Sequence, residues 1–251
     1  MSTTEIDTSS DTVIEITQLK KSFGDNYVLR GVDFKLARGE NVVVLGRSGC
    51  GKSVLIKCIS GLLRYDSGTV KVFNENISGI SNRQLNKLRE KIGFLFQSNA
   101  LYDSMTIREN LEFPLVRHLK LKSQTEIDKR VEEALNNVGL LNTIDMMPSE
   151  LSGGMRKRIG LARALIMKPE LMLYDEPTTG LDPITAKEIS NLMLDVQKKY
   201  NTSSIIISHD MNCAKITANR LLVLMDGLFY AEGTFEKLKQ SNDEKIKAFF
   251  E

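Results

Sequence analysis

The 251 residues are enough for one or two domains with a buried core, so disulfide or metal staples are not required. Hydrophobic residues make up 41% of the chain and charged residues 26%, as in ordinary globular proteins. The net charge of +2 excludes the one-sided basic composition of many nucleic-acid binders, and we expect no nucleic-acid partner. Three cysteines at unrelated spacings predict no disulfide framework and fit a reducing compartment.

The start of the chain differs in composition from the rest. Residues 1–11 are rich in Ser, Thr and Asp, and we predict a disordered N-terminal tail without the apolar segment of a signal peptide. Residues 12–251 are expected to form a single domain. No apolar run approaches the ~18 residues of a membrane span, so another chain must supply any crossing of a membrane.

Short apolar and β-branched runs predict strands along the whole chain. We expect strands at residues 13–19, in two short pieces of 27–36 separated by a turn at Gly31, and at 41–45, 92–95, 171–174, 204–207 and 221–225. Helices are expected at about 52–60, 82–89, 124–138, 154–167 and 183–200. This alternation predicts an α/β fold with a mostly parallel sheet. The stretch 98–150 shows no core strand and predicts a helical insertion.

A glycine-rich motif lies between the strand at 41–45 and the helix at 52–60. It fits G-x-x-x-x-G-K-[ST] and comprises Gly46, Arg47, Ser48, Gly49, Cys50, Gly51, Lys52 and Ser53. Its glycines let backbone N–H groups surround an anion at a helix N-terminus. Lys52 is expected to reach the β- and γ-phosphates, and Ser53 to offer its hydroxyl to Mg²⁺. The motif therefore predicts a nucleotide-binding site.

Two acids end the apolar strand at 171–174. Adjacent buried carboxylates are costly unless they face a cation. Asp175 suits a Mg²⁺ ligand, and Glu176 suits a general base that polarises the attacking water. The alternative is a strand that reaches solvent with acids at its tip.

Two histidines and one basic run have less specific contexts. His209 follows the strand at 204–207, where it fits a γ-phosphate contact that holds the base in line, or a capped core histidine. His118 lies in a polar stretch and is interpreted as a surface residue. Arg156, Lys157 and Arg158 are interpreted as the solvated face of a helix.

A second potential anion site opens the helix at 154–167. Residues 151–155 read Leu-Ser-Gly-Gly-Met, and the glycines again free backbone N–H groups at a helix start. One nucleotide does not need two phosphate cradles. We therefore predict that Ser152, Gly153 and Gly154 serve the nucleotide of a partner molecule.

These motifs together resemble the ABC ATPase superfamily over about residues 13–250. The ordered set is the phosphate loop, Gln97, residues 151–154, Asp175 with Glu176, residues 180–182 and His209. The resemblance implies a P-loop NTPase (RecA-like) core, an N-terminal antiparallel β subdomain and a helical subdomain inserted at about 98–153. It also implies an ATPase that uses ATP and Mg²⁺ as a homodimer of cassettes, peripheral at the cytoplasmic face of the inner (plasma) membrane, beneath an integral-membrane permease.

The same resemblance assigns roles to residues outside the phosphate loop. Gln97 looks like the glutamine that senses Mg²⁺ and the attacking water. Phe23 looks like the aromatic ring that stacks on adenine; Tyr27 is an alternative, and Phe23 also suits an ordinary core position. Ser152 and Gly154 would cap the γ-phosphate held by the other subunit.

Asp182 resembles the acid that links the two sites across such a dimer. It also suits a helix N-cap, because Pro183 fits a first helical position. The two roles are compatible.

Several segments point to one branch of the superfamily. Residues 97–115, Met155, residues 178–184 and residues 246–250 resemble the cassettes of Mla/Mce-type lipid transporters. This resemblance implies transport of phospholipid or another lipid with an Mce-like lipid-binding protein as a further partner. The lipid and the direction of transport do not follow from it.

Three alternatives remain open at this point. The first is a cassette of an importer for another substrate class, and the second a soluble ABC ATPase such as one that serves iron–sulfur assembly. The third is a regulator that binds ATP without turnover, although the presence of Glu176 and His209 favours an enzyme. Gln97 and Ser152 are 55 positions apart (152 − 97), too few for the long coiled coil of chromosome-type ATPases.

Cys50 lies inside the phosphate loop, beside Lys52 and near a helix N-terminus. Both neighbours favour the thiolate, so we predict that alkylation of Cys50 blocks ATP binding. The alternative is an inert residue whose thiol points away from the nucleotide.

Overall fold

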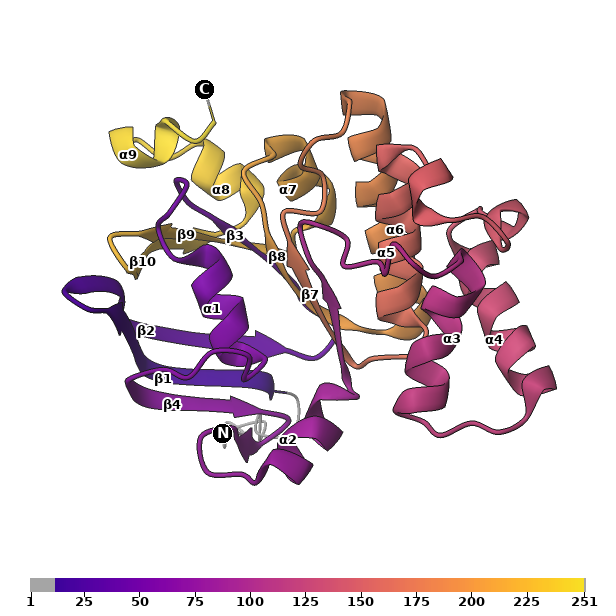
Figure 1. The fold of residues 1–251 in the computed structure, drawn as a ribbon. Helices are drawn as coiled ribbons and strands as arrows, with labels where there is room; N and C mark the ends of the chain where they lie inside the picture. Colours follow the sequence, from indigo (N-terminus) through magenta and orange to yellow (C-terminus); the bar gives the residue numbers. More distant parts are fainter. Residues whose placement is uncertain (1–11, 251) are drawn as a thin grey trace, which may run out of the picture.

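The computed structural model describes residues 12–250, which form two β-sheets with helices between and beside them (Figure 1). The predicted tail at residues 1–11 lies outside the described residues. The smaller sheet is antiparallel, in the order β2-β1-β4-β5. Its strands are β1 (Thr12–Phe23), β2 (Asn26–Ala37), β4 (Ser67–Val72) and β5 (Glu75–Asn76). In β2, buried Val32, Phe34 and Leu36 alternate with exposed residues, as expected for a sheet with one buried face.

The larger sheet has the order β10-β9-β3-β8-β7-β6 and is parallel except for the β9–β10 pair. Its central strands are buried at every position, which explains their continuous apolar sequences. The strands are β3 (Asn41–Leu45), β6 (Ile92–Leu95), β7 (Leu171–Asp175), β8 (Ser203–Ile207), β9 (Arg220–Met225) and β10 (Leu228–Gly233).

Helices cover both faces of the larger sheet (Figure 1). Helix α1 lies between the two sheets and shares a core with both, while α5, α6 and α7 pack on the opposite face. The helices are α1 (Lys52–Ile59), α2 (Asn82–Arg89), α3 (Ile107–Arg117), α4 (Gln124–Asn137), α5 (Gly153–Leu165), α6 (Pro183–Tyr200), α7 (Met211–Thr217), α8 (Phe235–Lys239) and α9 (Glu244–Lys247). The predicted fold class, an α/β P-loop core with an antiparallel β part and an inserted helical part, is confirmed.

A third core joins α3, α4 and one face of α5. Thr106 caps α3 through a capping box with Glu109, a local signal that starts the helix independently of packing. Helix α5 contributes Ile159 to this core and Leu161 to the core of the larger sheet. It therefore connects the inserted helices to the sheet.

Some element predictions were wrong. β2 is one continuous strand, not two pieces around a turn: Gly31 remains in the strand with φ +121°, a conformation that glycine tolerates. β10 was not predicted, because its residues alternate in exposure and form no apolar run. The C-terminal residues pack on the chain's own core, where Ile246 is buried and the Phe250 ring lies 5.3 Å from that of Phe235.

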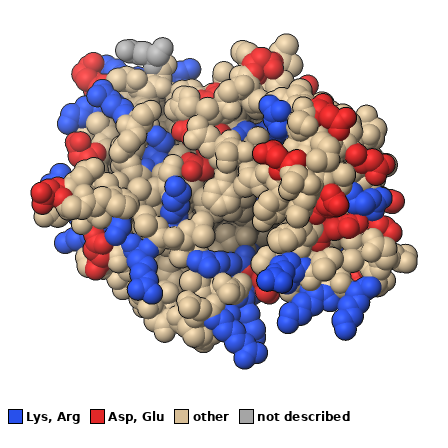
Figure 2. All heavy atoms as spheres, viewed as in Figure 1, with Lys and Arg blue, Asp and Glu red and all other residues tan. Residues whose placement is uncertain are grey.

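The surface carries both charge signs. Figure 2 shows Lys and Arg interspersed with Asp and Glu on the face seen in Figure 1. Within residues 12–250, no helix combines the length and the apolar character needed to cross a bilayer.

Candidate nucleotide-binding site

The predicted site residues follow four neighbouring strands of the larger sheet. The phosphate loop follows β3, Gln97 follows β6, Asp175 and Glu176 end β7, and His209 follows β8. Carboxyl ends of parallel strands share one edge of a sheet, and ligands of α/β proteins bind there. A cavity of about 360 Å³ lies at this edge. It is lined by Val28, Ser48, Gly49, Gly51, Lys52, Ser53, Val54, Gln97, Glu176, Thr179 and His209.

The phosphate loop approaches neighbouring atoms too closely for side chains at two of its glycines. A Cβ at Gly46 would lie 2.7 Å from the carbonyl oxygen of Leu224, and a Cβ at Gly51 would lie 2.7 Å from a methyl carbon of Val28. Gly51 also has φ +103° and precedes α1 without a side-chain cap. The first amides of α1 therefore have no side-chain acceptor, which fits an anionic ligand.

Lys52 is held inside this loop. Its side chain is buried, and its ammonium group donates to the carbonyl oxygens of Gly46 at 2.7 Å and Arg47 at 3.1 Å. A buried ammonium group needs such partners to offset its desolvation. The bonds place the positive charge across the mouth of the loop, where an anion would lie.

Ser53 and Asp175 place two oxygen atoms that can act as metal ligands next to each other. The Ser53 hydroxyl donates to Asp175 Oδ1 at 2.8 Å, and Asp175 is only 7% exposed. Mg²⁺ takes oxygen ligands and in nucleotide sites uses one or two protein groups together with phosphate oxygens. Ser53 and Asp175 therefore fit a Mg²⁺ ion that also takes phosphate oxygens as ligands.

Glu176 and His209 contact each other directly. His209 Nδ1 lies 2.7 Å from Glu176 Oε2, and the Thr179 hydroxyl donates to the same oxygen at 3.2 Å. The Glu176 side chain is 13% exposed and that of His209 66% exposed. Glu176 also has φ +51°, a strained conformation for a residue other than glycine, and such strain is common at functional sites. His209 is thus a surface partner of the acid, not a capped core histidine.

The signature residues lie outside the cavity. Ser152 caps α5 by accepting from the Met155 amide at 3.2 Å, and a Cβ at Gly154 would lie 2.7 Å from a methyl carbon of Thr185. Neither of these residues nor Gly153 lines the cavity of their own chain. Any contact between them and a nucleotide must therefore involve a different molecule or a different conformation.

Asp182 caps α6, as its position before Pro183 predicts. It accepts from the amides of Ile184 at 3.1 Å and Thr185 at 3.0 Å. The Thr185 hydroxyl and these amides lower the pKa of Asp182. The cap keeps this carboxylate ionised at the surface beside the signature residues.

Both candidate adenine-stacking rings are exposed. Phe23 is 50% exposed at the end of β1, and Tyr27 is 71% exposed at the start of β2. The core interpretation of Phe23 was therefore wrong. The ammonium group of Lys21 lies 5.1 Å from the Phe23 ring centroid, so the ring already has a cation beside it.

The prediction of a reactive Cys50 was wrong in its electrostatics. Burial raises the pKa of the Cys50 thiol, and this effect outweighs the nearby Lys52, which lowers it. The sulfur packs toward Gly46, where an added Cβ would lie 2.5 Å from it, and Cys50 does not line the cavity. Desolvation of the thiol, which the sequence does not show, sets the direction of this pKa shift.

Cys50 should therefore alkylate slowly at neutral pH. Only the thiolate reacts, and a raised pKa keeps it scarce until the pH exceeds the ordinary value of 9.0. The test is the rate of carbamidomethylation at Cys50 against pH, followed by mass spectrometry, with the unfolded chain as the reference. A rate that reaches its plateau below pH 8 would contradict this expectation.

The interpretation of Lys157 as part of a solvated face was also wrong. Lys157 is 2% exposed, and its ammonium group donates to the carbonyl oxygen of Gln97 at 2.9 Å. The flanking Arg156 and Arg158 are partly exposed. Sequence periodicity gave no sign that this lysine points inward.

The fold and this edge of the sheet define a P-loop nucleotide-binding protein. The family model described as ABC transporter matches residues 29–179, more than half of the chain, so the chain belongs to the ABC transporter family. Its members are ATPases that drive transport.

Relatives of the chain carry different names. Methionine import ATP-binding protein MetN of Rhizobium johnstonii is 38% identical over 225 residues, which cover 90% of this chain and 62% of that protein. The chain thus spans less than two thirds of this relative. Protein TRIGALACTOSYLDIACYLGLYCEROL 3 of Arabidopsis thaliana, a chloroplast protein, is 37% identical, with 97% of this chain and 75% of that protein covered.

A solved structure supports the fold and the class of site. The ATP-binding cassette MJ0796, in a dimeric post-hydrolysis state with ADP and Pi, matches with a TM-score of 0.81 and 31% identity. The match covers 88% of this chain and 98% of that one. A homologous cassette therefore dimerises and holds the products of ATP hydrolysis.

Proposed function

We propose that this chain binds and hydrolyses MgATP as a homodimer and thereby drives a separate membrane permease. The observation that carries the proposal is the convergence of the phosphate loop, Gln97, Glu176 and His209 on one cavity, with Asp175 hydrogen-bonded to Ser53 of its lining. In this assignment Lys52 and the loop amides bind the phosphates. Ser53, Asp175 and Gln97 would hold Mg²⁺, which would supply positive charge to the phosphate oxygens.

Glu176 is the general base in this proposal. It accepts a proton from the attacking water, while its contact with His209 and Thr179 fixes the carboxylate. The exposed side of His209 is available to the γ-phosphate. Phe23 is assigned to stack on adenine, with Tyr27 as the alternative, because both rings are exposed.

The signature residues support a shared site. Since Ser152, Gly153 and Gly154 do not line their own chain's cavity, we assign them to the γ-phosphate bound by the partner chain. The dimer of MJ0796 supports such pairing in a homologue. Asp182 is assigned to the contact between the two sites. Closure of the dimer would exclude water around the reacting groups.

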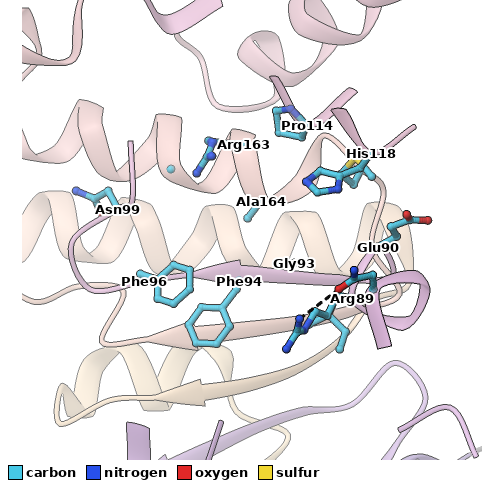
Figure 3. Close-up of a pocket in the computed structure, with 14 residues that line it drawn as sticks. Arg89, Glu90, Gly93, Phe94, Phe96, Asn99, Pro114, His118, Arg163 and Ala164 are labelled. Carbon is cyan, nitrogen blue, oxygen red and sulfur yellow. Dashed lines mark hydrogen bonds between the residues drawn. The ribbon is translucent and has the colours of Figure 1, made fainter. Parts of the chain in front are cut away.

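We assign the docking site of the permease to a groove between the larger sheet and the inserted helices. Figure 3 shows Phe94 and Phe96 side by side below α5, with Pro114 and His118 on the far wall. The groove has a volume of about 460 Å³ and contains Ala164. Stacked aromatic rings flanked by polar side chains suit a helix from a partner protein.

Ala164→Phe is expected to weaken docking of the permease and to leave ATP hydrolysis intact. The larger side chain fills the groove, and we expect roughly tenfold less permease to copurify, which corresponds to about 1.4 kcal/mol of binding energy. MgATP hydrolysis by the isolated chain should persist, since Ala164 does not line the nucleotide cavity. The matched control is Ala37→Phe, at an exposed position outside the groove. Equal recovery with both variants would exclude this docking site.

For the transported substrate we propose phospholipid or another lipid, with an Mce-like partner. Support comes from the resemblance of residues 97–115 to lipid-transporter cassettes and from the Arabidopsis relative, whose name is that of a glycerolipid. The Rhizobium relative named for methionine import favours a small-solute importer as the second candidate.

Affinity purification from detergent-solubilised native membranes, followed by mass spectrometry, separates these candidates. A polytopic permease with an Mce-like protein is expected. A permease with a soluble solute-binding protein would favour the small-solute importer. Recovery of soluble partners alone would contradict the transport proposal and place the chain with cytosolic ATPases such as those of iron–sulfur assembly.

A further inference from the structure

Lys157 is a buried cation directly behind the catalytic edge of the sheet. It lies in α5, one turn after the signature residues, and is 2% exposed. Burying an ammonium group costs free energy that a hydrophobic residue of similar size would avoid. Stability alone therefore gives no reason for a lysine here.

The ammonium group ties α5 to the end of β6. It donates to the carbonyl oxygen of Gln97 at 2.9 Å, so the bond holds the main chain of the residue assigned to Mg²⁺ and the attacking water. The side chain of Gln97 remains free to line the nucleotide cavity.

Two further residues on the same face of α5 extend this attachment. Arg163 donates to the carbonyl oxygen of Ala100 at 2.7 Å, and Gly160 lies between Lys157 and Arg163. A Cβ at Gly160 would lie 3.2 Å from the carbonyl oxygen of Asn99, so glycine permits the close approach. Spacings of three residues place all three positions on one side of the helix.

The attached segment is conformationally strained. Asn99 has φ +65° and Ala100 φ +51°, values that cost energy in residues other than glycine. The bonds from Lys157 and Arg163 hold its two ends, at Gln97 and Ala100. Movement of α5 would therefore move Gln97.

The two acids of β7 act on the same cation. The negative charges of Asp175 and Glu176 favour the charged form of Lys157 and oppose burial, which lowers its pKa. β6 and β7 are neighbours, with Leu95 opposite Tyr174, so the cation lies where both strands end. One side chain from the signature helix thus contacts the segment of Gln97 and interacts electrostatically with both acids.

We infer that Lys157 is a positioning residue for ATP hydrolysis, which acts by holding the main chain of Gln97 against the signature helix. The inference rests on the proposed function. Through this bond the position of α5 sets the position of Gln97, whose side chain lines the same cavity as Glu176. Lys157 thus links α5, and the inserted helices α3 and α4 that pack on it, to the nucleotide cavity.

The test compares Lys157→Met with Lys157→Arg in purified full-length chain. The methionine keeps the length of the side chain but cannot donate a hydrogen bond. We expect kcat for phosphate release to fall about tenfold or more, as displaced catalytic groups do, with KM for ATP changed less than about threefold. Lys157→Arg should recover most of kcat, and Lys187→Met, at an exposed lysine, should match the wild type. Lys157→Met leaves the carbonyl oxygen of Gln97 without this donor, so its Tm is expected to fall for any role of the lysine. The kcat loss and its recovery in Lys157→Arg, measured well below the Tm of every variant, therefore carry the test.

A double variant that also carries Gln97→Ala shows whether Lys157 acts through Gln97. In Gln97→Ala, the further change Lys157→Met should lower kcat less than about twofold, because groups that act as a unit are not additive. The same tenfold loss in this background, or unchanged kcat in Lys157→Met alone, would overturn the inference. A wild-type chain without phosphate release would instead refute the proposed function.

Discussion

Glu176→Gln should lower phosphate release by about 10²–10⁴-fold, the contribution of a positioned general base. The amide keeps the size of the side chain and a partner for His209, 2.7 Å away in the wild type, but it cannot accept the proton of the attacking water. The loop that binds the phosphates is unchanged, so MgATP affinity should stay close to that of the wild type. The measurements are steady-state phosphate release and equilibrium binding of a fluorescent ATP analogue.

The same variant should accumulate as an ATP-bound dimer. If two chains share the γ-phosphates, slow hydrolysis keeps them together. Light scattering with MgATP should show a dimer of Glu176→Gln and a monomer without nucleotide. Glu188→Gln, at a half-exposed glutamate of α6, is the control and should behave as the wild type. A Glu176→Gln chain that hydrolyses at more than half the wild-type rate would remove Glu176 from the mechanism.

Lys52→Met should weaken MgATP binding roughly 100-fold, since two charge-assisted hydrogen bonds of about 1.5 kcal/mol each are lost. In the free protein the ammonium group bonds only to the carbonyl oxygens of Gly46 and Arg47, so it is free to turn to phosphate oxygens. Isothermal titration calorimetry measures the change directly.

Lys57→Met provides the matched control for this loss. Lys57 is an exposed lysine of the same helix, five residues after Lys52. Its replacement by methionine changes the net charge by the same amount. The affinity of Lys57→Met for MgATP should remain within about twofold of that of the wild type, because exposed charges at a distance are screened. If both variants lost affinity equally, the effect would come from net charge, and Lys52 would have no specific role.

The sequence predicted those parts of the fold whose signals are local. β3, β7 and β8 are continuous apolar runs because both faces of a parallel sheet are covered, and such runs are visible without a structure. The helix over residues 183–200 was predicted at its observed bounds because Asp182 and Pro183 mark its start. β10 escaped prediction because Leu228 and Tyr230 are exposed and alternate with partly buried residues.

Sequence motifs placed the candidate site residues along the chain, but their surroundings in the folded protein were not predictable. Sequence motifs identified Lys52, Asp175 and Glu176 because each has a strand before it and a fixed spacing. The burial of Lys157 and the raised pKa of Cys50 depend on residues distant in the sequence that pack around them. Such burial is a tertiary property, which a run of three basic residues or a loop motif does not reveal.

The measurement that tests the central claim most directly is the rate of MgATP hydrolysis per chain at increasing protein concentration, with light scattering on the same samples. If Ser152, Gly153 and Gly154 complete the partner's site, the rate per chain should rise with concentration and level off as dimers form. A constant rate per chain in samples that remain monomeric would show that one chain suffices, and would contradict the shared site.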